Sequence, residues 1–260
     1  MVMMCQPIWD GVHAIEALDP RPATRLVMSP QGRLLDQRRR ESVEAALREF
    51  AAVDAQVAEL EEQSYFVRSL YLDDPQFAAF HAKVDGAPRR SRFRIRTYGA
   101  SRDDAMPWFL ETKGRDGAMV VKHRTPVLGR FDRGGGGDPL MRDVVANAVP
   151  GRVRERFEFE LVRRRIRPCV LVDYARRPYS TRFDPDFRVT FDTAIAATAT
   201  DSMHPEPRLA PRALLRGFTV MEVKFRRTVP AWFHRILRAN ELERESISKV
   251  ALATRELGLQ

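Results

Sequence analysis

The chain has 260 residues with 44 basic and 35 acidic side chains, a net charge of +9. Its 44% hydrophobic and 30% charged content excludes a disordered or fibrous chain, and its length suits one large domain. No apolar run approaches the roughly 20 residues that span a bilayer, and the start lacks the pattern of a signal peptide. Cys5 and Cys169 give neither a disulfide framework nor zinc spacing. We therefore expect a cytoplasmic protein with an irregular lead-in at 1–22 and a single domain at 23–260.

The first half of the chain predicts one long helix and then a series of strands. Apolar residues recur at helical spacing over 38–62, which predicts an amphipathic helix. Gly134–Gly137 lack the Gly-Lys-Ser/Thr of a phosphate-binding loop, so we predict a flexible loop there. The predicted strands are rich in β-branched and aromatic residues or alternate in polarity, and they are 23–30, 64–72, 90–98, 107–113 and 118–125.

The second half of the chain also predicts both helices and strands. The residues 199–213 are Pro-rich and polar, which predicts a long surface loop. Strands outnumber helices, and the short turns favour antiparallel pairing, so the predicted fold class is α+β. The predicted helices of this half are 139–165, 230–240 and 245–257. Its predicted strands are 168–176, 186–192 and 217–226.

Charged side chains gather on one face of each predicted strand. Because strand side chains alternate between faces, Arg92, Arg94 and Arg96 lie opposite Phe93 and Ile95. A sheet with one solvated face explains any one strand. The repeated cations and two Glu-x-Lys pairs are also compatible with an alternative, a closed barrel with a basic lumen. The charged or polar faces of the other strands carry Glu111, Lys113, Lys122, Arg124, Tyr174, Arg176, Arg188, Asp192, Glu222 and Lys224.

A basic lumen has a chemical consequence. Stacked like charges in a cavity are costly without an anion to neutralise them, so the pattern predicts a polyanionic ligand. The few carboxylates suit Mn²⁺ or Mg²⁺, which proteins hold with one or two carboxylates plus substrate phosphates. The five histidines are dispersed and give no zinc spacing. Lys83 is predicted to be an exposed lysine near a turn, and Asp73 is predicted to end a strand.

Eight short segments of the chain occur in the order seen in a known family. They are SLYLDD (69–74), RFRIRTYG (92–99), FLETKGR (109–115), KHR (122–124), VDYARRPY (172–179), RVTFD (188–192), MEVKF (221–225) and SISK (246–249). With them, residues 23–255 resemble the VTC domain, which is the polyphosphate polymerase domain of the vacuolar transporter chaperone complex and a member of the CYTH-like triphosphate tunnel metalloenzymes. The resemblance implies a closed antiparallel eight-stranded β-barrel flanked by helices, whose basic tunnel binds triphosphate with Mn²⁺ or Mg²⁺.

The resemblance also implies roles for individual side chains. Glu222 matches the family's metal-binding carboxylate, and Glu111 is a second metal candidate. The first strand departs from the family's acidic-x-Lys element, because Arg25 stands at the lysine position with no carboxylate two residues before it. The sequence does not decide between Lys122 and Arg124 for one phosphate contact. The implied catalytic residues are Lys224, Arg94, Arg96 and Lys122. The implied substrate-binding residues are Arg25, Arg92, Lys113, Arg124, Tyr174, Arg176, Arg188, Ser248 and Lys249.

The implied reaction is transfer of the γ-phosphate of ATP to a growing polyphosphate chain. Two alternatives use the same tunnel: a triphosphatase, in which water is the acceptor, and a non-catalytic module that binds polyphosphate or another polyanion. The expected partners are ATP or another triphosphate and inorganic polyphosphate. A specific nucleic acid is not expected, because Phe93 and Ile95 lie opposite the arginines instead of among them. Coupling to transport would need a membrane-protein partner.

Overall fold

The computed structural model describes most of the chain from residue 31 onward. The predicted strand 23–30, with Arg25, and the lead-in 1–22 lie outside the described residues. The described ranges are 31–60, 62–99, 106–117, 119–129, 135–181, 183–184, 186–226 and 228–260.

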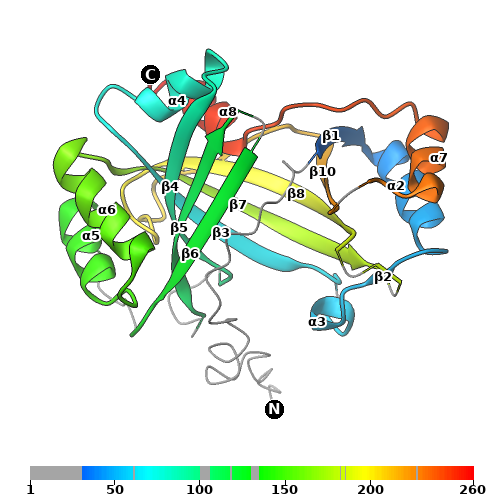
Figure 1. The fold of residues 1–260 in the computed structure, drawn as a ribbon, viewed down its shortest axis with the longest axis horizontal. Coiled ribbons are helices and arrows are strands. Elements are labelled where there is room, and N and C mark those ends of the chain that lie inside the picture. Colours follow the sequence, from blue (N-terminus) through cyan, green and yellow to red (C-terminus); the bar gives the residue numbers. More distant parts are fainter. Residues whose placement is uncertain are drawn as a thin grey trace.

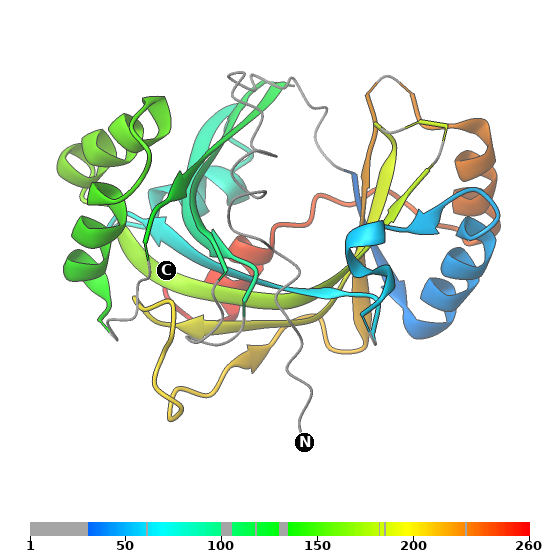
Figure 2. The ribbon, with the colours of Figure 1, turned by 90° about the horizontal axis from the view of Figure 1, so that it is seen from below.

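A single antiparallel sheet organises the molecule, which confirms the α+β class (Figure 1). Its strands follow the order β1-β10-β8-β7-β3-β4-β5-β6, with β2 paired to β7 and β9 to β8. The sheet curves so strongly that its two ends stand on opposite sides of a concave face (Figure 2). The strands are β1 (Gln31–Asp36), β2 (Ala52–Val53), β3 (Tyr65–Asp73), β4 (Arg89–Thr97), β5 (Trp108–Asp116), β6 (Met119–Val127), β7 (Arg167–Ser180), β8 (Arg188–Ala199), β9 (Arg212–Ala213) and β10 (Phe218–Lys224).

The ends of this path do not meet in the described part of the chain. No pairing between β6 and β1 is found among the described strands, so the structure has a curved eight-strand path where the resemblance implied a closed barrel. Adjacent strands of a sheet twist relative to one another, and long strands such as β7 bend with that twist. The curvature brings side chains from distant strands toward one concave face.

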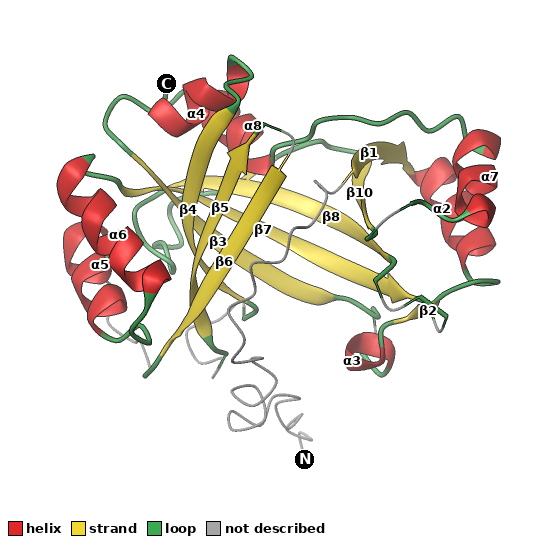
Figure 3. Ribbon diagram, in the orientation of Figure 1, coloured by secondary structure: helices red, strands yellow, loops and turns green. Residues whose placement is uncertain are grey.

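Helices cover the sheet in three groups (Figure 3). The first group lies beside β1 and β10, the second lies near β6, and the third joins the edge of β4 to β7 and β8. No helix among the described residues is long and apolar enough to cross a bilayer. The first group is α2 (Gln37–Leu47) and α7 (Ala231–Ala239), and the second is α5 (Gly137–Ala146) and α6 (Arg152–Arg163). The third group is α4 (Ala78–Val84) and α8 (Lys249–Glu256). A short helix, α3 (Ala55–Ala58), lies near β2.

The face opposite the charged one forms the hydrophobic core, as the alternation of residues predicts. Phe93 and Ile95 are 2% and 0% exposed, and the Phe93 ring meets Phe157 of α6 edge-on, with ring centroids 5.2 Å apart. A second cluster under α2 and α7 contains Phe191 and Phe233. Burying a side chain of this size contributes about 1.5–3 kcal/mol, so the covering helices hold the sheet in its curved shape.

Several element boundaries differ from the predicted ones. The predicted helix 38–62 is interrupted after Leu47, because Ala52–Val53 pair with β7, and beyond them only Ala55–Ala58 are helical. The predicted helix 139–165 divides into α5 and α6 at Pro150–Gly151, where Gly151 has a φ of 146°. The predicted loop 199–213 holds only the two-residue β9. Neither β1 nor α4 was predicted, whereas Asp73 ends β3 as expected.

Candidate functional site

The hairpin strands β4, β5 and β6 bring the first group of charges together around Glu111. The register places Arg94 opposite Glu111, whose carboxylate accepts from Arg94 Nε at 2.8 Å. Lys122 Nζ lies 2.9 Å from Glu111 Oε1. Glu111 is 1% exposed; burial alone would raise the pKa of its carboxyl, but Arg94, Arg96 and Lys122 lower that pKa well below its usual range. The carboxylate is therefore ionised and holds two cations on the concave face.

Arg96 and Arg124 occupy different surroundings on the same strands. Arg96 is buried and donates from Nε to Ser69 Oγ and from Nη2 to the Tyr174 hydroxyl, both at 3.1 Å. Arg124 is exposed and stacks over the Phe109 ring, with its guanidinium carbon 4.8 Å from the ring centroid. Between the two candidates for one phosphate contact, it is Lys122 whose amine lies beside the buried carboxylate.

The second group of charges surrounds Asp192 on the opposite wall of the concave face. Arg176 of β7 donates two hydrogen bonds to Asp192 of β8, at 2.6 and 2.7 Å, and one to Glu222 Oε2 of β10 at 3.2 Å. Lys249 of α8 lies 2.6 Å from Asp192 and 3.0 Å from Glu222. Burial alone would lower the pKa of Lys249, but Asp192 and Glu222 outweigh it and raise that pKa. The lysine at the start of α8 is thus charged and 8% exposed.

Tyr174 and Ser248 connect the two groups. The Tyr174 ring lies under Arg176 and Lys249, at 5.2 and 5.0 Å from its centroid, while its hydroxyl accepts from Arg96. Ser248 is the N-cap of α8 and accepts from the Ala251 amide; its hydroxyl also accepts from Arg92 Nη1 at 2.8 Å. The Ser-Lys pair therefore ties α8 to both walls of the concave face.

Three lysines of this face have unusually low pKa values. Burial is the main cause, and it lowers the pKa of Lys113 and Lys224 to about 8 and that of Lys122 to about 7. Neighbouring charges act in both directions on these pKa values. Glu111 raises the pKa of Lys122 and Glu222 raises those of the other two lysines, but burial and the nearby arginines outweigh both carboxylates. An anion that joined these lysines would restore their charge.

Arg188 and Tyr71 complete the face. Arg188 Nη2 donates to Asp54 at 3.2 Å and is the more exposed partner, so it lies at an outer edge of the site. Tyr71, which was not among the predicted site residues, accepts from Arg94 Nη1 at 2.9 Å. Its position in the quoted segment SLYLDD and its register opposite Arg94 are the signals that place it here. Burial raises the pKa of Tyr71, but Arg94 and Arg96 bring it down to about 8.

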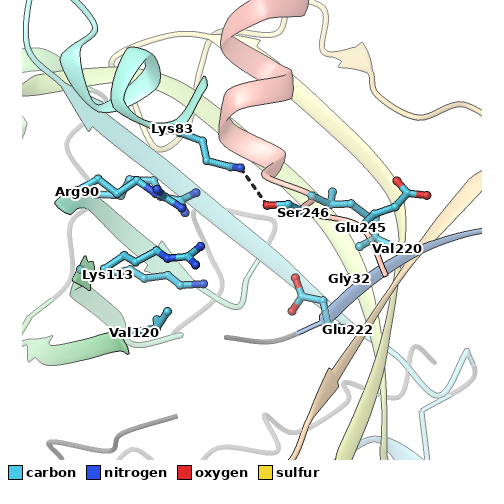
Figure 4. Close-up of a pocket in the computed structure, with 13 residues that line it drawn as sticks. Gly32, Lys83, Arg90, Lys113, Val120, Val220, Glu222, Glu245 and Ser246 are labelled. Carbon is cyan, nitrogen blue, oxygen red and sulfur yellow. Dashed lines mark hydrogen bonds between the residues drawn. The ribbon is translucent and has the colours of Figure 1, made fainter. Parts of the chain in front are cut away.

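A pocket opens at one end of this face (Figure 4). Lys113 points into it from β5, and Glu222 lies across from that lysine on β10. Lys83 lies near the end of α4, next to the turn at 85–86, so its predicted place near a turn is confirmed. Its side chain is partly buried and lines the pocket, so the predicted exposure is wrong. The remaining lining residues that matter below are Arg90, Arg92, Arg115 and Ser246.

The two predicted metal ligands differ in how well they fit a divalent cation. The described residues contain no group of three or more His, Cys, Asp and Glu side chains that could hold a metal. Glu222 lines the open pocket, and its two oxygens receive one contact each from Lys249 and Arg176, which leaves lone pairs available. Glu111 is enclosed by cations. The residues thus fit an ion held by Glu222 and substrate phosphates, while Glu111 as a metal ligand stays a prediction.

Comparison with known proteins identifies the family. The model of the VTC domain matches residues 33–257, which include β1 through α8 and every described residue of the candidate site. The chain therefore belongs to the VTC domain family, and this confirms the resemblance seen in the sequence. No curated protein matches the chain.

Several solved structures are distantly similar. A Bacillus halodurans protein described as a candidate adenylate cyclase is 10% identical, with 86% of this chain and 94% of that chain covered and a TM-score of 0.49. A Pyrococcus horikoshii protein is 14% identical, with coverage of 88% and 98% and a TM-score of 0.44. The Mimivirus capping enzyme triphosphatase is 7% identical, with coverage of 82% and 88% and a TM-score of 0.34.

Proposed function

We propose that this chain is a metal-dependent phosphotransferase that moves the γ-phosphate of ATP onto a polyphosphate chain. The observation that carries the proposal is the concave face itself, where cations from β4, β6, β7 and α8 surround the buried carboxylates Glu111 and Asp192. Membership of the VTC domain family supports the same reading. We further propose that the working form is a closed tunnel, in which the ends of the curved sheet are joined.

The arrangement suits the binding of a triphosphate. Arg94, Arg96 and Lys122 would contact it from one wall, and Arg176 and Lys249 from the other. Phosphoryl transfer relies on positioning and charge stabilisation more than on covalent help from the protein. The buried carboxylates hold these cations in place, so the site is organised before the substrate arrives.

The transfer step needs little acid or base chemistry from the chain. The terminal oxygen of the acceptor polyphosphate is already anionic, so it can attack the γ-phosphorus in line without a general base. The bond from the γ-phosphorus to the oxygen bridging to the β-phosphate breaks, and ADP leaves with that oxygen. Lys224 and Arg96 would neutralise charge on the transferred group.

A divalent cation has a defined place in this proposal. Glu222 would hold Mn²⁺ or Mg²⁺ together with phosphate oxygens of the substrate. Such an ion, when bound, would neutralise charge that develops on those oxygens. The contacts of Glu222 with Lys249 and Arg176 keep this carboxylate ionised and oriented toward the pocket.

The experiment that tests the proposed function is incubation of the protein with ATP and Mn²⁺, followed by separation of the products by chain length on a gel. A polymerase produces long polyphosphate chains and ADP. Release of orthophosphate alone would contradict the proposal in favour of a triphosphatase. Binding of tripolyphosphate without turnover would contradict it in favour of a binding module.

A further inference from the structure

Five cations line the pocket without carboxylate partners. Among the described residues, none of the five takes part in an ion pair, and each lies on α4, β4 or β5. Two of them, Arg92 and Lys113, belong to the candidate site already described. The other three extend the positive charge outward from it, and we call these three the mouth cations. The mouth cations are Lys83, Arg90 and Arg115.

The mouth differs in this respect from the inner part of the face. There the cations are neutralised by the protein itself: Arg94 and Lys122 by Glu111, and Arg176 and Lys249 by Asp192. The inner cations are therefore organised around internal anions. Glu222 and Glu245 also line the pocket, but among the described residues neither forms an ion pair with a mouth cation, so the charge of the mouth cations is available to a ligand.

Neutral contacts hold the mouth cations in position at the pocket. Lys83 Nζ donates to Ser246 Oγ at 3.0 Å (Figure 4). Arg90 donates from Nη1 to the Ala87 carbonyl at 2.5 Å, and its buried Nε has no hydrogen-bond partner. Arg115 donates from Nε to the Gly117 carbonyl at 2.8 Å. None of these contacts neutralises charge.

The like charges of the mouth also act on one another. Burial lowers the pKa of Lys83, and Arg90, Arg92 and Arg115 lower it further. Arrangements of this kind are costly unless an anion joins them. Arg92 connects the mouth to the inner face, because it also bonds Ser248 at the start of α8 and lies opposite Lys113 in the register.

We infer that Lys83, Arg90 and Arg115 form a second anion site, which binds phosphates of a linear polyphosphate that extends beyond the triphosphate on the inner face. The inference rests on the proposed function, because it assumes that the inner face binds the first phosphates. A chain that leaves the inner face past Arg92 and Lys113 would meet the mouth cations next. The site would therefore favour long polyphosphate over tripolyphosphate.

The test compares the affinities for tripolyphosphate and for long polyphosphate, measured by calorimetry without nucleotide or metal. In a variant with Lys83→Gln, Arg90→Gln and Arg115→Gln, we expect the affinity for the long chain to fall about tenfold, since each exposed ion pair contributes only a little. Tripolyphosphate binding should change by less than about twofold. The matched control removes the same charge at exposed sites with Arg142→Gln, Arg216→Gln and Arg235→Gln, and it should keep the preference of the wild type.

The outcomes separate this inference from the proposed function. A mouth variant that keeps the wild-type preference for long chains overturns the inference. Wild-type protein that binds tripolyphosphate but shows no preference for the long chain overturns it as well and leaves the proposed function standing. Wild-type protein that binds neither ligand overturns the proposed function. If the triple variant does not fold, Lys83→Gln alone serves, and it should reduce the preference for the long chain by about twofold.

Discussion

Lys249 and Asp192 join the C-terminal helix α8 to the strand β8, with the ammonium nitrogen 2.6 Å from an oxygen of the fully buried Asp192 carboxylate. The same carboxylate accepts two hydrogen bonds from Arg176. Asp192 is fully buried and contacts both cations, so we expect its role to be to position them. Removing it would leave both cations buried without their main partner.

Asp192→Asn should therefore destabilise the fold. Breaking a buried ion pair from one side costs about 3 kcal/mol or more, and we expect the free energy of unfolding to fall by about that amount in urea denaturation. Asp116→Asn is the matched control, because Asp116 pairs with Arg89 at 3.1 Å where the two side chains are 59% and 83% exposed. This control should lose less than about 1 kcal/mol. Equal losses in both variants would contradict a central role for Asp192.

Anion binding should weaken as the pH rises from about 7 to about 9. The pKa values of Lys122, Lys113 and Lys224 are about 7, 8 and 8, so these lysines lose their charge in that interval. A bound anion favours the protonated form, so binding takes up protons. Calorimetry of tripolyphosphate binding in buffers of different ionisation enthalpy measures this uptake.

A charge-preserving variant provides the control for that pH dependence. Arginine keeps its charge across the whole interval, so Lys113→Arg, Lys122→Arg and Lys224→Arg together should flatten the profile. A profile as steep as that of the wild type would show that other groups are responsible. No change of wild-type affinity between about pH 7 and about pH 9 would contradict the low lysine pKa values.

Tyr71 should ionise at a lower pH than a tyrosine ordinarily does. The protein has five tyrosines, and the pKa of Tyr71 is about 8 because Arg94 and Arg96 stabilise the phenolate. An ultraviolet titration of tyrosinate should show an early phase equal to one tyrosine, and Tyr71→Phe should remove it. An early phase that persists in the variant would assign it to a different tyrosine. Saturating tripolyphosphate should shift the wild-type phase to higher pH, because it offsets the arginine charges.

Phe157→Ala should lower the stability of the fold without changing the affinity of the site for its ligand. Phe157 is fully buried on α6 and contacts Phe93, on the side of β4 opposite its arginines. Loss of a buried phenylalanine costs about 3–5 kcal/mol, so the melting temperature should fall clearly. Tripolyphosphate affinity of the folded fraction should stay within about twofold of wild type. A large loss of affinity at temperatures where the variant is folded would contradict the separation of the two faces.

The faces of the strands could be predicted from the sequence because alternation is a local property. Arg92, Arg94 and Arg96 lie opposite Phe93 and Ile95 in the sequence and in the structure. The pairing of individual charges could not be predicted in this way. Arg176 and Glu222 meet across β8, and that contact depends on the register and curvature of three strands.

The missed elements have identifiable physical causes. The helix predicted over 38–62 stops at Leu47 because the backbone of 52–54 bonds to β7, a tertiary interaction that local propensity does not contain. Helix α4 has only seven residues, too short for a clear period. Its one usable signal is the pair Asp73 and Asp74, whose carboxylates accept from the amides of Ala78, Ala79 and Phe80 at its first turn.

That missed helix matters for the site. Because α4 was absent from the predicted elements, Lys83 stood in a turn and looked like a solvent-exposed lysine. In the structure α4 packs against α8 and β4, and it carries Lys83 to Ser246 at the pocket. The position of Lys83 at the pocket could therefore not be predicted from the sequence, whereas Arg90 and Arg115, the other two mouth cations, lie on the strands β4 and β5.

The measurement that tests the central claim most directly compares wild-type protein with Glu222→Gln in the presence of ATP and Mn²⁺, with the products resolved by chain length. We predict long polyphosphate from the wild type and none from the variant, with tripolyphosphate binding in the absence of metal retained because the loss of a carboxylate does not remove any cation. Retained binding also shows that the variant is folded. Polyphosphate synthesis by Glu222→Gln at the wild-type rate, or wild-type protein that forms only orthophosphate, would contradict the account.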